Sequence, residues 1–372
     1  MTSKERVQTA LRHEEPDRVP ICAEFVPEVT AALKQRLGID DYYDMLVALG
    51  SDMLLATAGI SAGFYGKPDE NGEYVCPWGC TYKYFSNDSG SYSEIIKHPL
   101  ADDPDGAKLA AYRIPDPLEE SQYAKLKHIV EKYGGTHFIC GSLACSIFEA
   151  SWYLGGLVNI LERMAIDPGY TNALFDKMME FPLKAGPKMI DMGADMIWLG
   201  DDVGMQTGMM MSPGTWREYL KPRMKKLIST FKQHKPEIKV AYHSCGNIKP
   251  IIPDLIEIGL DVLNPIQPLA MDPAEIKDEF GDRLCFWGSI CIQNTLPKGS
   301  VDDIRNEVKL RMDTIGKGGG LIMSPAHNVQ ADTSVENILA LFDAAKELGR
   351  YSGASETSET SETSETSEAT EA

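Results

Sequence analysis

The stretch VAYHSCGN, residues 240–247, decides how this sequence is interpreted. An apolar, β-branched run over residues 238–242 passes there into a polar segment that closes on Gly246. Side chains alternate across a strand, so His243 and Cys245 point to the same side, with backbone positions about 6.5 Å apart. An imidazole and a thiolate at that separation can converge on one atom between them. The stretch therefore indicates a strand whose end carries a pair of candidate ligands.

Seven further runs share the character of this one, being short, apolar or β-branched, and bounded by turn residues. The eight candidate strands are residues 19–24, 52–57, 137–142, 195–200, 239–243, 261–265, 284–289 and 320–324. Amphipathic helical stretches separate most of them, which predicts a parallel sheet covered by helices. Eight such units in about 350 residues fit a closed (β/α)8 TIM barrel, an α/β fold, with a doubly wound sheet as the alternative. The first strand is followed by no glycine-rich phosphate turn, which disfavours that alternative.

Three segments depart from the repeating pattern. Residues 63–100 form an insertion after the second strand, and GKPDENGEYVCPWGCTYKYF within it predicts a β-hairpin lid that turns at residues 70–72. The glycines at 316–320 precede their strand, so we interpret them as a turn after a helix rather than a phosphate loop. Residues 351–372 repeat Ser-Glu-Thr and predict a disordered tail after a single barrel domain over residues 1–350.

Charge and composition exclude several classes of protein. The 372 residues carry 36 Lys and Arg against 55 Asp and Glu, a net charge of −19, of which six glutamates of the tail contribute −6. An acidic body argues against a nucleic-acid partner. No apolar run approaches the ~18 residues of a membrane span, and the charged N-terminal stretch does not resemble a signal peptide. We therefore expect a cytoplasmic protein whose eight cysteines are free thiols.

In a barrel of this kind, the loops that follow the C-terminal ends of the strands carry the chemistry. Polar and soft side chains gather at these positions, namely Asp201, Asp202 and Met205 after the fourth strand, His243 and Cys245 after the fifth, Gln267 after the sixth, Cys291 after the seventh, and His327 and Asn328 after the eighth. Catalytic zinc takes three protein ligands and keeps an open position. His243 and Cys245 are two candidates, and His327 is the third, with Cys291 as a weaker one. A pocket histidine beside a buried thiol is the alternative interpretation.

Two other sets of residues at this rim allow more than one role. Asp201 and Asp202 are candidates for a general acid or base, or for binding a cationic group, although adjacent acids also cap helices. Met205 and the methionines that follow it indicate a soft apolar lining, or else helix packing.

Several motifs resemble the uroporphyrinogen decarboxylase superfamily. They are EEPDRVP near the start, GDDVGMQTGMMMSPGTWREYLKPRMKKLI, HSCGNIKPIIPDLIEIGLDVLNPIQ, DRLCFWGSI and SPAHNVQADTSVENILALFDA. The resemblance spans about residues 3–349 and implies a (β/α)8 barrel. The superfamily has two branches, the decarboxylases of haem biosynthesis and the zinc methyltransferases that move methyl groups between corrinoid proteins and a thiol, such as methylcobalamin:coenzyme M methyltransferase.

The first branch matches less well than the second. Decarboxylases carry a histidine that corresponds to His327, but they hold the porphyrinogen carboxylates with an arginine motif near the first strand. This chain has no arginine between Arg18 and Arg36. The resemblance therefore disfavours a porphyrinogen decarboxylase.

The methyltransferase branch carries His-x-Cys at the end of the fifth strand, which matches His243 and Cys245. Its third zinc ligand is a cysteine, where this chain has His327, and Gln267 falls near an acidic residue of that branch. The resemblance implies that Zn²⁺ holds an acceptor thiol as thiolate, which attacks the methyl group of a methylated corrinoid (methylcobalamin) on a partner protein.

We therefore expect a zinc-dependent, corrinoid-linked methyltransferase. Its expected partners are a corrinoid-binding protein and a small thiol or similar acceptor, and a second copy of the chain in a homodimer. The residues that we assign are His243, Cys245 and His327 to the metal, Asp201, Asp202 and Gln267 to catalysis, and Trp78, Met205 and Asn328 to the cofactor. Two alternatives stay open, a metal-free decarboxylase of a smaller carboxylate substrate and a non-catalytic corrinoid-binding barrel.

Overall fold

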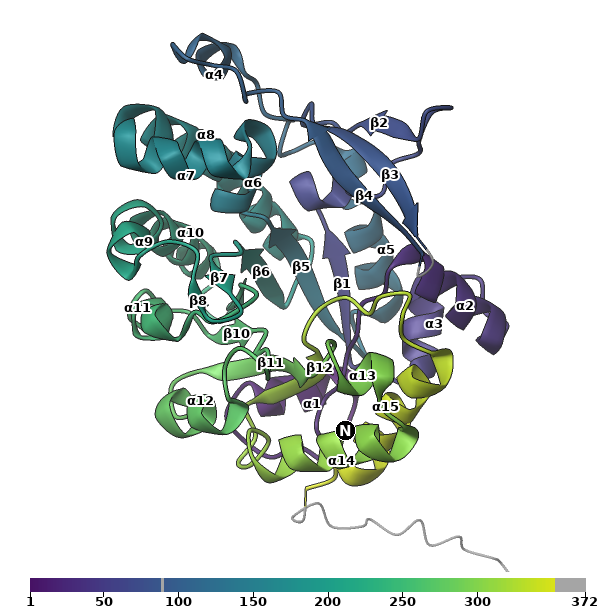
Figure 1. Ribbon diagram of the computed structural model, residues 1–372. Helices are drawn as coiled ribbons and strands as arrows, with labels where there is room; N and C mark the ends of the chain where they lie inside the picture. The colour runs from purple at the N-terminus through teal and green to yellow at the C-terminus, as the bar shows by residue number, and fades with distance from the viewer. Residues whose placement is uncertain (88–89, 352–372) are drawn as a thin grey trace, which may run out of the picture.

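Seven parallel strands form one curled sheet in the order β1-β5-β6-β9-β10-β11-β12 (Figure 1). The computed structural model describes residues 1–87 and 90–351, so nearly all of the predicted tail lies outside the described residues. The strands are β1 Met53–Thr57, β5 Phe138–Ala144, β6 Met196–Gly200, β9 Lys239–His243, β10 Val262–Asn264, β11 Cys285–Ile290 and β12 Leu321–Pro325. Each begins and ends within two residues of a predicted strand.

The segment around Ile21 and Phe25 takes the place of the eighth strand. Ile21 pairs in parallel with Met323 of β12, and Phe25 pairs with Val329. On the other side, the backbone N–H of Asp52, next to β1, donates to the carbonyl of Ile21 at 2.7 Å. The segment therefore lies between β12 and β1 and closes the barrel. The predicted (β/α)8 fold is confirmed, and the doubly wound sheet is wrong.

Helices surround this barrel (Figure 1). They are α1 Ser3–Ala10, α2 Pro27–Leu37, α3 Tyr42–Leu49, α4 Ala107–Ala111, α5 Ala124–Tyr133, α6 Phe148–Gly155, α7 Leu157–Ile166, α8 Pro168–Asp191, α9 Pro213–Tyr219, α10 Lys221–His234, α11 Ile252–Glu257, α12 Pro273–Phe280, α13 Thr295–Lys298, α14 Val301–Asp313 and α15 Val335–Leu348. Among the described residues, none of these helices has the length and hydropathy needed to cross a membrane.

Strand alternation divides the core into two apolar clusters. Met53 and Leu55 of β1 face the barrel interior, whereas Leu54 and Ala56 face the layer between sheet and helices. Because both faces of each strand are buried, the strands are almost continuously apolar, which is why they were visible in the sequence. Trp198 is partly buried and packs against the edge of the interior cluster. The fully buried side chains of that cluster fill the barrel on the inner side of Trp198.

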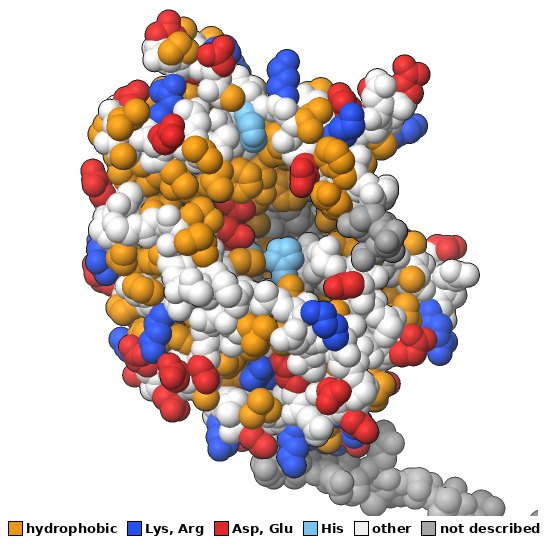
Figure 2. All heavy atoms as spheres, viewed as in Figure 1, with side chains coloured by type: hydrophobic (Ala, Val, Ile, Leu, Met, Phe, Trp, Pro, Cys, Tyr) orange, Lys and Arg blue, Asp and Glu red, His pale blue; other side chains and the backbone are white. Residues whose placement is uncertain are grey.

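The insertion after β1 is a three-stranded antiparallel sheet of β2 Glu73–Val75, β3 Thr81–Asn87 and β4 Gly90–Lys97, in that order. The predicted turn over residues 70–72 exists, since the N–H of Gly72 donates to the carbonyl of Asp69 at 3.1 Å. That turn leads into β2 instead of joining two paired strands, so the predicted hairpin is corrected to a sheet of three strands. Figure 2 shows a hollow in the molecular surface near this sheet, bordered by hydrophobic, acidic and histidine side chains.

The glycines between α14 and β12 form a turn, as predicted. Gly319 has φ +76°, and a Cβ there would lie 2.2 Å from the carbonyl oxygen of Glu14. The N–H of Gly320 donates to the carbonyl of Ala10 at 3.0 Å. The glycines therefore let the chain pass close to α1 before it enters β12.

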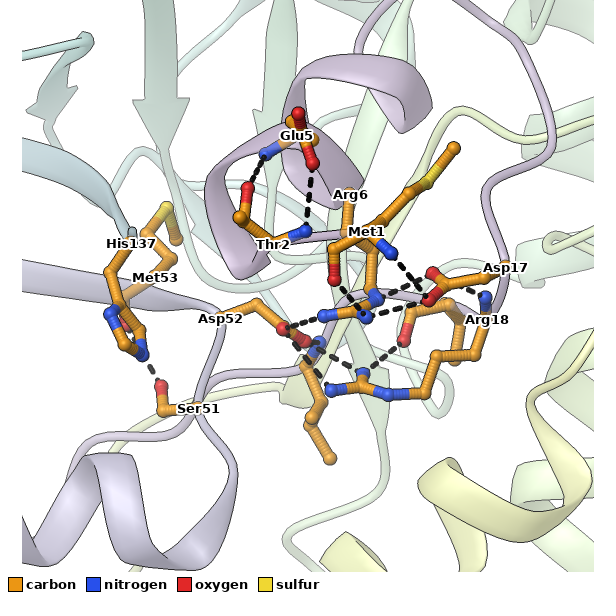
Figure 3. Close-up of polar contacts among 12 residues, drawn as sticks. Met1, Thr2, Glu5, Arg6, Asp17, Arg18, Ser51, Asp52, Met53 and His137 are labelled. Atoms are coloured by element: carbon orange, nitrogen blue, oxygen red, sulfur yellow. Dashed lines mark hydrogen bonds and ion pairs between the residues drawn. The ribbon is translucent and has the colours of Figure 1, made fainter. Parts of the chain in front are cut away.

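A buried network of charges ties the N-terminal helix to the lower end of the barrel (Figure 3). The side chain of Asp52 is fully buried and accepts from Arg6 at 2.6 Å and from Arg18 at 2.7 Å. It also accepts from the N–H of Ile21 at 2.9 Å. Arg6 in turn binds Asp17 at 2.7 Å. These contacts join α1, the closing segment and β1 at one point.

Candidate metal centre

His243, Cys245 and His327 converge at the end of the barrel where the strands terminate. Their ligand atoms all lie within 4.8 Å of one another. The Sγ of Cys245 is 3.5 Å from the Nε2 of His243, and the rings of the two histidines are 6.0 Å apart. The structure thus brings together the three residues that were predicted as metal ligands from the sequence. Cys291, the weaker candidate, is buried and is not a member of this group in the described part of the chain.

The loop that carries Cys245 is held by hydrogen bonds from neighbouring strand ends. The N–H of Cys245 donates to Oδ1 of Asp202 at 2.7 Å, and the N–H of Gly246 donates to Oε1 of Gln267 at 2.9 Å. Gly246 has φ +79°, and a Cβ there would lie 2.6 Å from the backbone of Met205. Glycine is therefore required at this position, because any side chain would push the cysteine loop away from the loop after β6.

Asn264 determines which nitrogen of His243 is available to a metal. It ends β10 directly beside His243 in the β9–β10 register. Its Nδ2 donates to the carbonyl of Trp287 at 3.0 Å, so its Oδ1, 2.6 Å from Nδ1 of His243, is the acceptor. Nδ1 therefore carries the proton, and the lone pair of Nε2 points toward Cys245. The sequence analysis did not select Asn264, although its place at a strand end next to β9 was a usable signal.

The two adjacent acids after β6 have different surroundings. Oδ1 of Asp202 lies 3.5 Å from Nε2 of His243, so this carboxylate borders the ligand group. Asp201 is buried and accepts from the N–H groups of Ile147 and Glu149, both at 2.9 Å. Burial raises the pKa of Asp201 to about 7. The structure therefore gives Asp201 the alternative role of capping α6, and leaves Asp202 at the site.

Glu149 is an acid of this region that the sequence analysis missed. It lies at the start of α6 and is 7% exposed. Burial raises the pKa of Glu149 well above its usual value, and the charges of Asp202 and Asp201 raise it further. In the sequence, Glu149 is a single acid among apolar helix residues, and nothing there marks it as part of a site. Its acidic neighbours, Asp201 and Asp202, come from the loop after β6.

The remaining predicted site residues differ in how exposed their side chains are and in what they contact. Gln267 positions the cysteine loop, and Asn328 follows His327 directly. Met205 is 49% exposed on the short strand β7 Gly204–Met205, beside that loop. Trp78 is 4% exposed and packs on Phe181 of α8, with ring centroids 5.3 Å apart. Trp78 therefore packs against α8, and its role toward the cofactor stays a prediction.

The three candidate ligands have the chemistry that zinc requires. Burial raises the pKa of the Cys245 thiol, and so does the charge of Asp202. Burial lowers the pKa of His327, and so does His243. The site thus favours a neutral imidazole at His327, the form that binds metals, and it needs a cation to stabilise the thiolate of Cys245. Two imidazole nitrogens and one thiolate, with a carboxylate alongside, fit a zinc ion that retains an open position.

Comparison with known proteins gives matches over most of the chain. A family model described as uroporphyrinogen decarboxylase (URO-D) matches residues 79–348. A methylcobamide:CoM methyltransferase, MtaA of Methanosarcina barkeri, is 26% identical over 372 residues, covering 93% of this chain and 98% of the relative. The methylcobamide:CoM methyltransferase MtbA of Methanosarcina acetivorans is 25% identical over 358 residues, with the same coverage. A solved structure of a methyltransferase from Methanosarcina mazei, 22% identical, covers 93% of this chain and 99% of that chain with a TM-score of 0.72, so the folds agree.

Proposed function

The chain belongs to the uroporphyrinogen decarboxylase family as one of its methyltransferases, and from this premise we propose that it moves a methyl group between a corrinoid and a thiol with zinc at His243, Cys245 and His327. The corrinoid is carried by a partner protein, and the thiol is the small-molecule acceptor. The observation that carries the proposal is the convergence of the three ligand atoms within 4.8 Å at the catalytic end of the barrel.

The residues around the ligands have separate tasks in this proposal. A zinc ion bound there supplies a Lewis acid that keeps an acceptor thiol as thiolate at neutral pH, ready to take the methyl group. Asn264 fixes the orientation of His243 through Nδ1. Asp202 positions the backbone of Cys245 through Oδ1, and we assign its other oxygen as the acceptor of the proton that the thiol loses.

The metal-free decarboxylase receives less support. It needs a carboxylic acid of the pair after β6 and His327 to act without a metal, but Asp201 is engaged by two backbone N–H groups of the α6 start. His327 lies beside His243 and Cys245, which are suited to hold a cation.

Metal analysis and turnover of the full chain test the proposal. We expect about one zinc per chain, and zinc-dependent transfer of the methyl group of free methylcobalamin to 2-mercaptoethanol. Treatment with a chelator should abolish the transfer, and added zinc should restore it. Absence of stoichiometric zinc, or full transfer by chelated protein, would contradict the proposal.

Replacing Asn264 with alanine is expected to weaken zinc binding by about 10- to 100-fold, because His243 loses the acceptor that orients it. Competition with a chromophoric chelator measures this affinity. The matched control is Gln233→Ala, which removes an exposed amide from α10 and should leave the zinc affinity unchanged. Equal affinities of the two variants would show that Asn264 does not orient the ligand.

A further inference from the structure

A cavity of about 500 Å³ opens at the same end of the barrel, between the inserted sheet and α6. Its wall is largely aromatic, with Phe64, Tyr65, Tyr82, Tyr92, Trp152 and Tyr153. The ring of Phe64 lies 5.2 Å from that of Tyr153 and 6.3 Å from that of Tyr82. Figure 2 shows a hollow on this face of the molecule, with hydrophobic side chains around it. The volume is that of a small-molecule site.

Two residues connect this cavity to the metal site. Gln330, which lies three residues beyond His327 in the same loop, lines the cavity. Tyr153 lines it from α6, and burial raises the pKa of its phenol, as do the charges of Glu149 and Asp202 nearby. Because Gln330 and His327 belong to one loop, the cavity lies at the same end of the barrel as the metal ligands.

The charges around the cavity are negative. Among its described lining residues, Glu94 is the charged side chain, and the lining includes no lysine or arginine. Burial raises the pKa of the Tyr65 phenol, and the charges of Glu28 and Glu24 raise it further. The imidazole of His98, also on the wall, is engaged by the carbonyl of Tyr153 at 2.7 Å.

We propose that this cavity binds an organic ammonium group, and that the small molecule that exchanges its methyl group at the metal site carries this group. Aromatic faces attract quaternary ammonium ions, and nearby carboxylates add to that attraction. An anionic head, such as a sulfonate, meets carboxylates there and finds no basic side chain in the described lining. The second half of this inference rests on the proposed function, whereas ammonium binding by the cavity does not.

Three thiols with the same two-carbon spacer compare a cationic, a neutral and an anionic head group. They are thiocholine, 2-mercaptoethanol and 2-mercaptoethanesulfonate, each titrated calorimetrically into the zinc-loaded full chain. We expect thiocholine to bind about tenfold more tightly than 2-mercaptoethanol, with the sulfonate weakest. Binding of the neutral thiol or of the sulfonate as tightly as thiocholine would overturn the inference.

Variants of the wall test where the preference arises. Phe64→Leu keeps an apolar side chain but removes a ring, and it should reduce the ratio of thiocholine to 2-mercaptoethanol affinity about threefold. Glu94→Gln should reduce the ratio about threefold. The matched control is Glu73→Gln on the neighbouring β2, where the carboxylate pairs with Lys83 at 3.0 Å and does not line the cavity. An unchanged ratio in Phe64→Leu would contradict the proposed site.

Choline, which has no thiol, separates this inference from the proposed function. It should bind the metal-free full chain, and Phe64→Leu should weaken that binding. If the protein holds no zinc but binds choline in this way, the proposed function fails and the ammonium site stands. Zinc-dependent transfer could instead be found while choline does not bind and thiocholine binds no more tightly than 2-mercaptoethanol. In that case the ammonium site alone is wrong.

Discussion

The Cys245→Ala variant is expected to lose its zinc and its methyl transfer while keeping its fold. Cys245 supplies the one thiolate of the ligand group, and so the negative charge that binds the cation most strongly. Even partners that only orient a zinc ligand change affinity or activity by about 10- to 100-fold, so removal of a ligand should lower both by more than about 100-fold. Metal analysis after dialysis and the methylcobalamin assay measure the two losses, and circular dichroism checks the fold.

Cys291→Ala is the matched control for that variant. Cys291 is 5% exposed after β11 and was the other candidate for the third ligand. Its removal should leave the zinc content at about one per chain if His327 is the third ligand. Retention of zinc by Cys245→Ala, or its loss from Cys291→Ala, would mean that the metal is held by a different set of residues.

Replacing Asp52 with alanine is expected to destabilise the barrel by about 3–5 kcal/mol, the range observed when one partner is removed from a buried ion pair. Asp52 is fully buried and accepts from both Arg6 and Arg18 (Figure 3). Without it, two guanidinium groups remain at the junction of α1 and the closing strand segment with one fewer carboxylate. Denaturant unfolding followed by circular dichroism measures the change.

The control for this effect is Asp282→Ala. Asp282 pairs with Arg283 at 3.1 Å, but both side chains are at least half exposed. Exposed pairs contribute at most about 1 kcal/mol, so this variant should unfold close to the native chain. If Asp52→Ala unfolds at the same denaturant concentration as the control, the charge network does not hold the barrel closed.

The fold was predictable because strands that are buried on both faces consist of nearly continuous apolar residues. Such runs can be recognised in the sequence without knowledge of the tertiary contacts. Runs such as that of β9 have an apolar, buried centre over residues 240–242 and are flanked by polar residues, so their bounds can be read locally. The insertion was predicted less well. Its turn at 70–72 has the expected residues, but which strands pair with one another depends on contacts between β2, β3 and β4.

The candidate ligands were predictable for a related reason. The position of His243, Cys245 and His327 after strand ends is enough to place them at one rim of a barrel. Asn264 and Glu149 were missed because their roles arise from the register of β9 with β10 and from the packing of α6 on the loop after β6. The packing of the Trp78 ring on Phe181 of α8 likewise depends on tertiary contacts that the sequence does not show.

X-ray absorption at the zinc edge of the full-length protein measures the ligands of the metal themselves. We expect one sulphur at about 2.3 Å and two imidazole nitrogens at about 2.0–2.1 Å, with a second sulphur when a thiol is added. In His327→Ala, the spectrum should lose one of the two nitrogens. Absence of stoichiometric zinc, or two sulphurs before any thiol is present, would contradict a zinc site built from His243, Cys245 and His327.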